Sequence, residues 1–80
     1  MAEVAVFLAP GFEEIEAFTV VDYLRRANVQ VRTVSVPEEN SSRNEIVVVG
    51  SHGVTIIADS TLRDYIERME KNRSEEHTSE

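Results

Sequence analysis

Eighty residues, 41% of them hydrophobic and 29% charged, fit one small globular domain near the lower size limit for burying an adequate core. The net charge of −7, with no basic cluster larger than Arg25-Arg26, argues against a nucleic-acid or anionic-membrane surface. The absence of cysteine excludes disulfides, thiolate metal sites and a cysteine nucleophile within these residues.

The chain opens with a predicted buried strand and an amphipathic helix. Residues 4–9 (VAVFLA) are continuously apolar and precede Pro10-Gly11, which is typical of a strand buried on both faces. Residues 13–28 are predicted to form a helix, with acidic residues in its first turn and basic residues in its last. Asn28 can adopt the left-handed conformation that ends a helix. The apolar stripe of this helix comprises Ala17, Val20, Val21, Leu24 and Ala27.

Residues 29–36 alternate between apolar and polar side chains, which indicates an edge strand with one solvated face. Strand, helix and strand in succession predict a βαβ unit with parallel strands. Residues 37–45 are polar and leave no room for a second crossover helix. Residues 46–50 and 54–58 then predict a small hairpin around Ser51-His52-Gly53.

Asp59-Ser60-Thr61 offers helix caps, and residues 62–72 predict a polar helix. Residues 73–80 (RSEEHTSE) have neither periodicity nor apolar content, which predicts a disordered tail, and they match the translation of a common sequencing-adapter sequence. We therefore expect residues 1–72 to be the truncated amino-terminal part of one domain and residues 73–80 to be an adapter-derived artefact. We expect no chemistry from His77.

Three carboxylates, Glu13, Glu14 and Glu16, follow the first strand, at the end of the strand where α/β sheets bind ligands. Glu13 and Glu14 are interpreted mainly as stabilisers of the helix start, whereas Glu16 lies at the border of the apolar stripe. His52 is interpreted as a turn residue. Because the sequence has no second histidine before residues 73–80 and no paired carboxylates at metal-binding spacing, we predict no metal site and no cofactor.

The opposite face of the first helix carries large apolar residues where solvent is expected, which suggests a protein partner. Its charged residues, four positions apart, can form an ion pair. This face comprises Ile15, Phe18, Asp22 and Arg26.

The run Ala-Pro-Gly-Phe-Glu-Glu-Ile-Glu-Ala, followed by Leu-Arg-Arg-Ala and by VVVGSHGVTIIAD, resembles the amino-terminal third of the ThiJ/PfpI family, in the branch of the Parkinson-associated protein DJ-one and the bacterial protein deglycases. The resemblance covers residues 1–62 and implies part of a flavodoxin-like, class I glutamine amidotransferase-like three-layer α/β sandwich. It implies a homodimer that packs through the Ile15 face of the helix.

The resemblance also implies a cysteine nucleophile beyond this chain, against which Glu16 would lie as a protonated acid, with Gly11, Glu13 and Glu14 at the pocket rim. The expected activities are deglycase or glyoxalase chemistry on α-oxoaldehyde or glycated substrates, or peptidase-like hydrolysis, in a cytoplasmic protein. Without the cysteine, this chain alone is expected to be inactive.

Two alternatives stay open. One is a receiver-like signalling domain in which Glu13, Glu14 and Asp59 would bind Mg²⁺ and accept phosphate, although residues 37–45 do not provide the helix that receivers need. The other is a non-catalytic chaperone or stress protein of the same fold.

Overall fold

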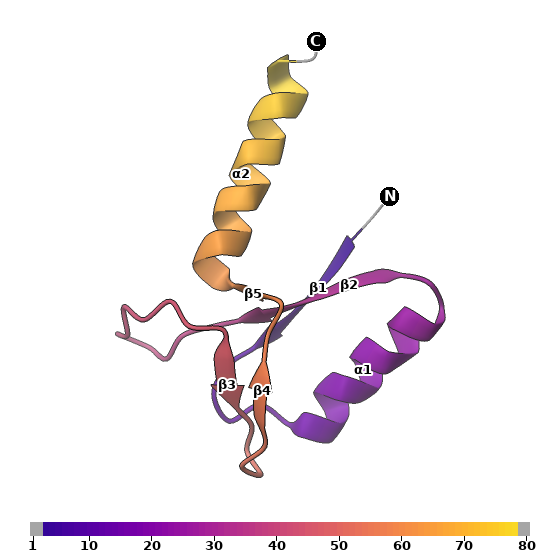
Figure 1. Cartoon of the computed structure of the whole chain (residues 1–80), viewed down its shortest axis with the longest axis vertical. Coiled ribbons are helices and arrows are strands. Elements are labelled where there is room, and N and C mark those ends of the chain that lie inside the picture. The colour runs from indigo at the N-terminus through magenta and orange to yellow at the C-terminus, as the bar shows by residue number, and fades with distance from the viewer. Residues whose placement is uncertain (1–2, 79–80) are drawn as a thin grey trace.

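The computed structural model describes residues 3–78 as a parallel sheet, two helices and a separate antiparallel hairpin (Figure 1). The sheet has the order β1-β2-β5. The elements along the chain are β1 (Glu3–Leu8), α1 (Glu14–Arg26), β2 (Gln30–Ser35), β3 (Val47–Val49), β4 (Thr55–Ile57), β5 (Ser60–Thr61) and α2 (Leu62–Thr78).

The predicted βαβ unit is confirmed. β1 and β2 pair in parallel, with Glu3 opposite Gln30 and Leu8 opposite Ser35, and α1 connects them. The helix ends as expected, because Asn28 takes a φ of 65° and its backbone N–H donates to the Arg25 carbonyl. The chain therefore reverses at once into β2.

The prediction that β2 is an edge strand is wrong. β5 pairs in parallel with its carboxyl-terminal half, Val34 opposite Ser60 and Ser35 opposite Thr61. Thr33, Val34 and Ser35 are accordingly buried, and only the amino-terminal half of β2 has a single partner strand. Alternating polarity indicates that one face of a strand is exposed to solvent. An edge strand, by contrast, is one that lacks a neighbouring strand to pair with on one side.

The prediction that β1 is buried on both faces is also wrong within this chain. Leu8 and Val34 are almost completely buried and form the centre of the core, but Phe7 is 55% exposed. Phe7 has one aromatic neighbour, Tyr65 of α2, at a ring-centroid distance of 6.1 Å. Much of α2 projects away from the sheet (Figure 1), so this face of the sheet is thinly covered.

The accessible surface shows the same incomplete coverage. It measures 6166 Å², against about 4,900 Å² for a compact monomer of this mass. A chain that buries so little apolar surface should have marginal stability.

The hairpin of β3 and β4 is confirmed, with Val47 opposite Ile57 and Val49 opposite Thr55. The predicted start of the second helix is confirmed too, since the Asp64 N–H donates to the Thr61 hydroxyl at 3.1 Å and Thr61 caps α2.

The end of α2 differs from the sequence prediction. The helix continues to Thr78 instead of ending near Asn72, because residues 73–78 contain neither glycine nor proline and include good helix formers. Helical backbone thus replaces most of the expected disordered tail, and residues 79–80 lie outside the described residues. Neither α1 nor α2, as described, is long and apolar enough to cross a membrane.

Asp59 joins the end of the hairpin segment to the sheet. Its carboxylate accepts hydrogen bonds from the backbone N–H of Thr33 at 2.9 Å and from the Thr33 hydroxyl and Arg25 at 3.1 Å. The backbone bond from Thr33 is the main reason that the pKa of Asp59 lies below its ordinary value. Asp59 therefore acts as a structural tie, and the described loop between β2 and β3 contains no helix. Both observations disfavour a receiver-like domain.

Candidate functional site

The site is built where the hairpin docks on the loop between β1 and α1. Gly11 takes a φ of 84°, a conformation that favours glycine, and its backbone N–H donates to the Val49 carbonyl at 2.8 Å. The Ser51 N–H donates to the Phe12 carbonyl, also at 2.8 Å. These two bonds place the hairpin turn directly beside the first turn of α1.

Glu14 is the buried acid of this junction, with 7% of its surface exposed. Its Oε2 accepts hydrogen bonds from the backbone N–H groups of His52 at 2.8 Å and Val54 at 3.3 Å, and its Oε1 lies 2.9 Å from His52 Nδ1. Gly50 packs so closely that a Cβ there would overlap the Glu14 side chain. One carboxylate thus organises the whole hairpin turn.

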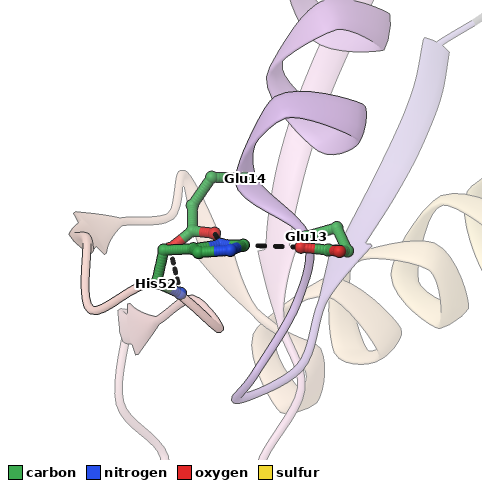
Figure 2. Close-up of side chains that lie close together, drawn as sticks. All are labelled: Glu13, Glu14 and His52. Atoms are coloured by element: carbon green, nitrogen blue, oxygen red, sulfur yellow. Dashed lines mark hydrogen bonds and ion pairs between the residues drawn. The ribbon is translucent and has the colours of Figure 1, made fainter.

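Glu13 approaches the same imidazole from the exposed side. Figure 2 shows Glu13, which precedes α1, and Glu14, the first residue of α1, converging on His52 in the hairpin turn. Glu13 Oε1 lies 3.6 Å from His52 Nδ1 and accepts a hydrogen bond from the Ser51 hydroxyl at 2.8 Å. Two carboxylates, one hydroxyl and one imidazole therefore share a small volume.

These contacts shift the pKa values of Glu14 and His52 in opposite directions. Burial alone would raise the pKa of Glu14, but the hydrogen bonds from the His52 side chain and from backbone N–H groups outweigh it and lower that pKa from 4.5 to about 2. The hydrogen bond to Glu14, and then the charges of Glu14 and Glu13, raise the pKa of His52 above 6.5. The contacts favour an ionised carboxylate beside an imidazolium.

The attachment of the hairpin to α1 should therefore weaken both at low pH, through Glu14, and at high pH, through His52. The depressed pKa of Glu14 stabilises the folded junction above 4.5, and this contribution disappears as the pH falls toward 2. The raised pKa of His52 stabilises it below 6.5, and this contribution disappears as the pH rises through the raised pKa. Amide hydrogen exchange of the His52 N–H, corrected for its intrinsic pH dependence, should show strongest protection between 4.5 and 6.5.

The variant His52→Gln provides the control for this measurement. It should abolish the loss of protection at alkaline pH while keeping the loss in acid, which belongs to Glu14. Protection that does not change from mildly acidic to alkaline pH in the unmodified chain would contradict the assigned ion pair.

A depression of about 480 Å³ opens over the junction. Glu16, the predicted catalytic acid, lines it and is exposed, and Gly11, predicted at the rim, is not among the lining residues. The lining comprises Glu13, Glu14, Ile15, Glu16, His52 and Val54.

The structure assigns Glu14 a larger part than the sequence analysis did. Glu14 was interpreted as a helix-start residue, yet it is the most buried and most hydrogen-bonded of the three carboxylates. One signal was available: Glu14 precedes the buried Val21 by almost two helical turns, so the two share a face. His52 gave no signal, because its contact with Glu14 spans 38 residues.

The predicted partner face is present in part. Ile15 is 84% exposed, and Arg26 and Asp22 form the expected ion pair at 2.9 Å. Phe18 is half-buried because its ring packs edge-on against Phe12 at a centroid distance of 5.6 Å.

The prediction of no metal site rested on sequence spacing, and that ground is insufficient. The fold gathers ligand atoms of Glu13, Glu14 and His52 within 4.8 Å of one another.

The parallel sheet with its crossover helix and an acidic helix start after the first strand places the chain among the α/β proteins. Residues 2–70 match the DJ-1/PfpI family. Together with its solved relatives, this match shows that the chain belongs to the DJ-1/PfpI family, which confirms the resemblance and the fold that it implied.

Three solved structures illustrate the relationship. The DJ-1 superfamily protein STM1931 of Salmonella typhimurium, a cysteine-to-alanine mutant, is 42% identical with a TM-score of 0.70, over 80% of this chain and 31% of that one. Oxidized Toxoplasma gondii DJ-1 is 34% identical with a TM-score of 0.66, over 85% and 33%. A threonine-to-proline mutant of Schizosaccharomyces pombe DJ-1 is 25% identical with a TM-score of 0.68, over 79% and 31%. The chain thus spans about a third of these relatives.

Proposed function

We propose that this chain is the amino-terminal part of a cysteine-dependent DJ-1/PfpI enzyme and supplies the acidic wall of its active site. The proposed reaction is deglycase or glyoxalase-like chemistry on an α-oxoaldehyde or a glycated substrate, with peptidase-like hydrolysis as the alternative enzyme activity. The nucleophile would come from residues outside these eighty, since the chain contains no cysteine.

The observation that carries the proposal is the position of Glu16. Its side chain lines a depression of about 480 Å³, beside two further carboxylates, at the carboxyl end of β1. Exposure of Glu16 in this chain is compatible with a wall that another part of a longer protein covers. The solved relatives, of which this chain spans about a third, leave ample sequence for such a part.

The proposed role of Glu16 is to activate the thiol. A carboxyl group desolvated by a covering segment has a raised pKa and stays protonated. Its O–H then donates a hydrogen bond to the sulfur, which favours the thiolate and lowers the cysteine pKa. The thiolate attacks the aldehyde carbon of the substrate, and the carbonyl oxygen, now carrying the negative charge, takes up a proton.

The test is the rate of methylglyoxal consumption by the full-length gene product. Glu16→Gln should lower kcat/KM on the order of 10²-fold or more, and replacing the cysteine should abolish the reaction. Glu70→Gln makes the same chemical change at an exposed position of α2 and should leave the rate unchanged. The 80-residue chain alone should show no activity.

Two outcomes would contradict the proposal. Full activity of the Glu16→Gln variant would remove Glu16 from the mechanism. Activity that survives replacement of the cysteine, or that is absent while the protein still suppresses aggregation of a client protein, would favour the non-catalytic chaperone alternative.

We also propose that the protein is cytoplasmic and forms a homodimer. The dimer would pack through the α1 face that carries Ile15, Phe18, Asp22 and Arg26. The large exposed area of Ile15 supports this, because a bulky apolar side chain on a solvated helix face is typical of an interface. Analytical ultracentrifugation of the full-length product should detect a dimer, and a monomer at all accessible concentrations would contradict it.

A further inference from the structure

The contacts between α1 and the hairpin turn leave four ligand-type atoms facing one another. His52 Nδ1 lies 2.9 Å from Glu14 Oε1 and 3.6 Å from Glu13 Oε1. The Ser51 hydroxyl lies 2.8 Å from Glu13 Oε1, 3.4 Å from Glu14 Oε1 and 3.0 Å from His52 Nδ1. These atoms lie close together and come from two segments of the chain that the fold brings side by side.

The separations agree with the dimensions of a tetrahedral zinc site. Ligands at the usual zinc distances of about 2.0–2.1 Å are separated from one another by about 3.3 Å. His52 Nδ1 lies 2.9 Å from Glu14 Oε1 and 3.6 Å from Glu13 Oε1, which brackets that value, and the ligand atoms of all three residues lie within 4.8 Å of one another. A cation could therefore be held once the carboxylates of Glu13 and Glu14 move toward each other.

The two oxygens of Glu14 have separate tasks. Oε2 is held by the backbone N–H groups of His52 and Val54, and Oε1 points to the cluster. Hydrogen bonds of this kind orient the ligating carboxylates of metal sites. Oε2 thus fixes the orientation of the carboxylate, and Oε1 is available to a cation.

We propose that Glu13, Glu14 and His52 form a binding site for a divalent transition-metal cation, of which Zn²⁺ is the representative. Glu13 Oε1, Glu14 Oε1 and His52 Nδ1 are the three protein ligands, and a water molecule held by the Ser51 hydroxyl takes the fourth position. The cation displaces the Nδ1 proton of His52 to solvent, because only a deprotonated imidazole nitrogen binds a metal. Two carboxylates match the charge of the cation, and the mixed nitrogen and oxygen donors favour Zn²⁺ over Mg²⁺ or Ca²⁺, which prefer oxygen alone.

This site is independent of the proposed catalytic role of Glu16. Glu16 lines the same depression but contributes no atom to the cluster. All three ligands lie within the eighty residues, so cation binding can be measured without the cysteine, and its failure would leave the proposed enzyme activity untouched.

The experiment is isothermal titration of the metal-free chain with Zn²⁺. We expect saturable binding of one Zn²⁺ per chain. His52→Gln and Glu13→Gln should each weaken binding at least about tenfold, since the loss of a ligand should cost no less than the loss of a second-shell partner. The matched control is His77→Gln, which removes the other histidine of the chain and should leave the affinity unchanged. Mg²⁺ should bind much more weakly than Zn²⁺.

A second measurement avoids the variants, in case any of them unfolds. On addition of Zn²⁺ to the unmodified chain, the imidazole resonances of His52 should shift to saturation in the NMR spectrum, together with the amide resonances of the hairpin turn. Equal affinities of the chain and its His52→Gln variant, Mg²⁺ binding as tight as Zn²⁺ binding, or shifts confined to His77 would each overturn the proposal.

Discussion

Replacing Leu8 by alanine should leave the chain largely unfolded. Leu8 is 1% exposed and, with Val34, forms the centre of the small core. Truncation of a fully buried leucine costs roughly 2–5 kcal/mol of unfolding free energy. A chain of this length has about 4–12 kcal/mol in total by the usual range per residue, and the thin cover of its sheet places it near the lower end. Far-ultraviolet circular dichroism during thermal unfolding measures the effect.

The control for Leu8→Ala is Ile57→Thr. Ile57 lies in β4 and is 71% exposed, and threonine keeps the β-branch that suits a strand. This variant should stay within about 0.5 kcal/mol of the unmodified chain. If Leu8→Ala melts at the same temperature as Ile57→Thr, the core described here is not what holds the chain together.

Gly50→Ala should detach the hairpin from α1. A Cβ at Gly50 would lie 2.7 Å from Glu14 Cγ and would overlap its carboxyl group as well. The Glu14 carboxylate cannot simply move aside, because the backbone of the hairpin turn and the His52 ring hold it. Overpacking of this kind costs typically about 1–3 kcal/mol, and hydrogen-exchange protection of the turn should fall with it.

A double-mutant cycle isolates the cause. Glu14→Ala removes the side chain that the new methyl group would meet, so Gly50→Ala should cost much less in the Glu14→Ala background than in the unmodified chain. Equal costs in both backgrounds would show that the cost of Gly50→Ala does not come from the close approach of Glu14.

The sequence was sufficient for the local elements. Continuous apolar residues before Pro10-Gly11, the helical apolar stripe, Asn28 as a helix terminator and Thr61 as a cap all report on contacts within a few residues. Each of these features has its counterpart in the structure. The same reasoning missed the pairing of β5 with β2, since a two-residue strand carries no periodicity.

The site was harder to predict than the fold because it is formed by tertiary contacts between segments that lie far apart in the sequence. Glu13, Glu14 and Glu16 were recognised as a group from their place after β1, but their burial depends on where the hairpin docks. The close approach at Gly50 and the backbone bonds to Glu14 exist only after docking. The position after β1 therefore identified the three carboxylates as a group, but it could not show which of them is buried.

Glu14 and Glu16 have different roles in the first turn of α1. Glu14 is a structural anchor with a strongly lowered pKa, committed to the ionised form by its hydrogen bonds. Glu16 lines the open depression and has no hydrogen-bond partner among the described side chains. We propose that it is the one available to act on a nucleophile.

The central claim is that this acidic wall belongs to a cysteine-dependent site completed by a longer protein. An independent reading of the coding DNA beyond codon 72 tests it most directly. The frame should continue beyond codon 72 and encode a cysteine. A stop codon directly after codon 72, or a continuation that contains no cysteine, would contradict it.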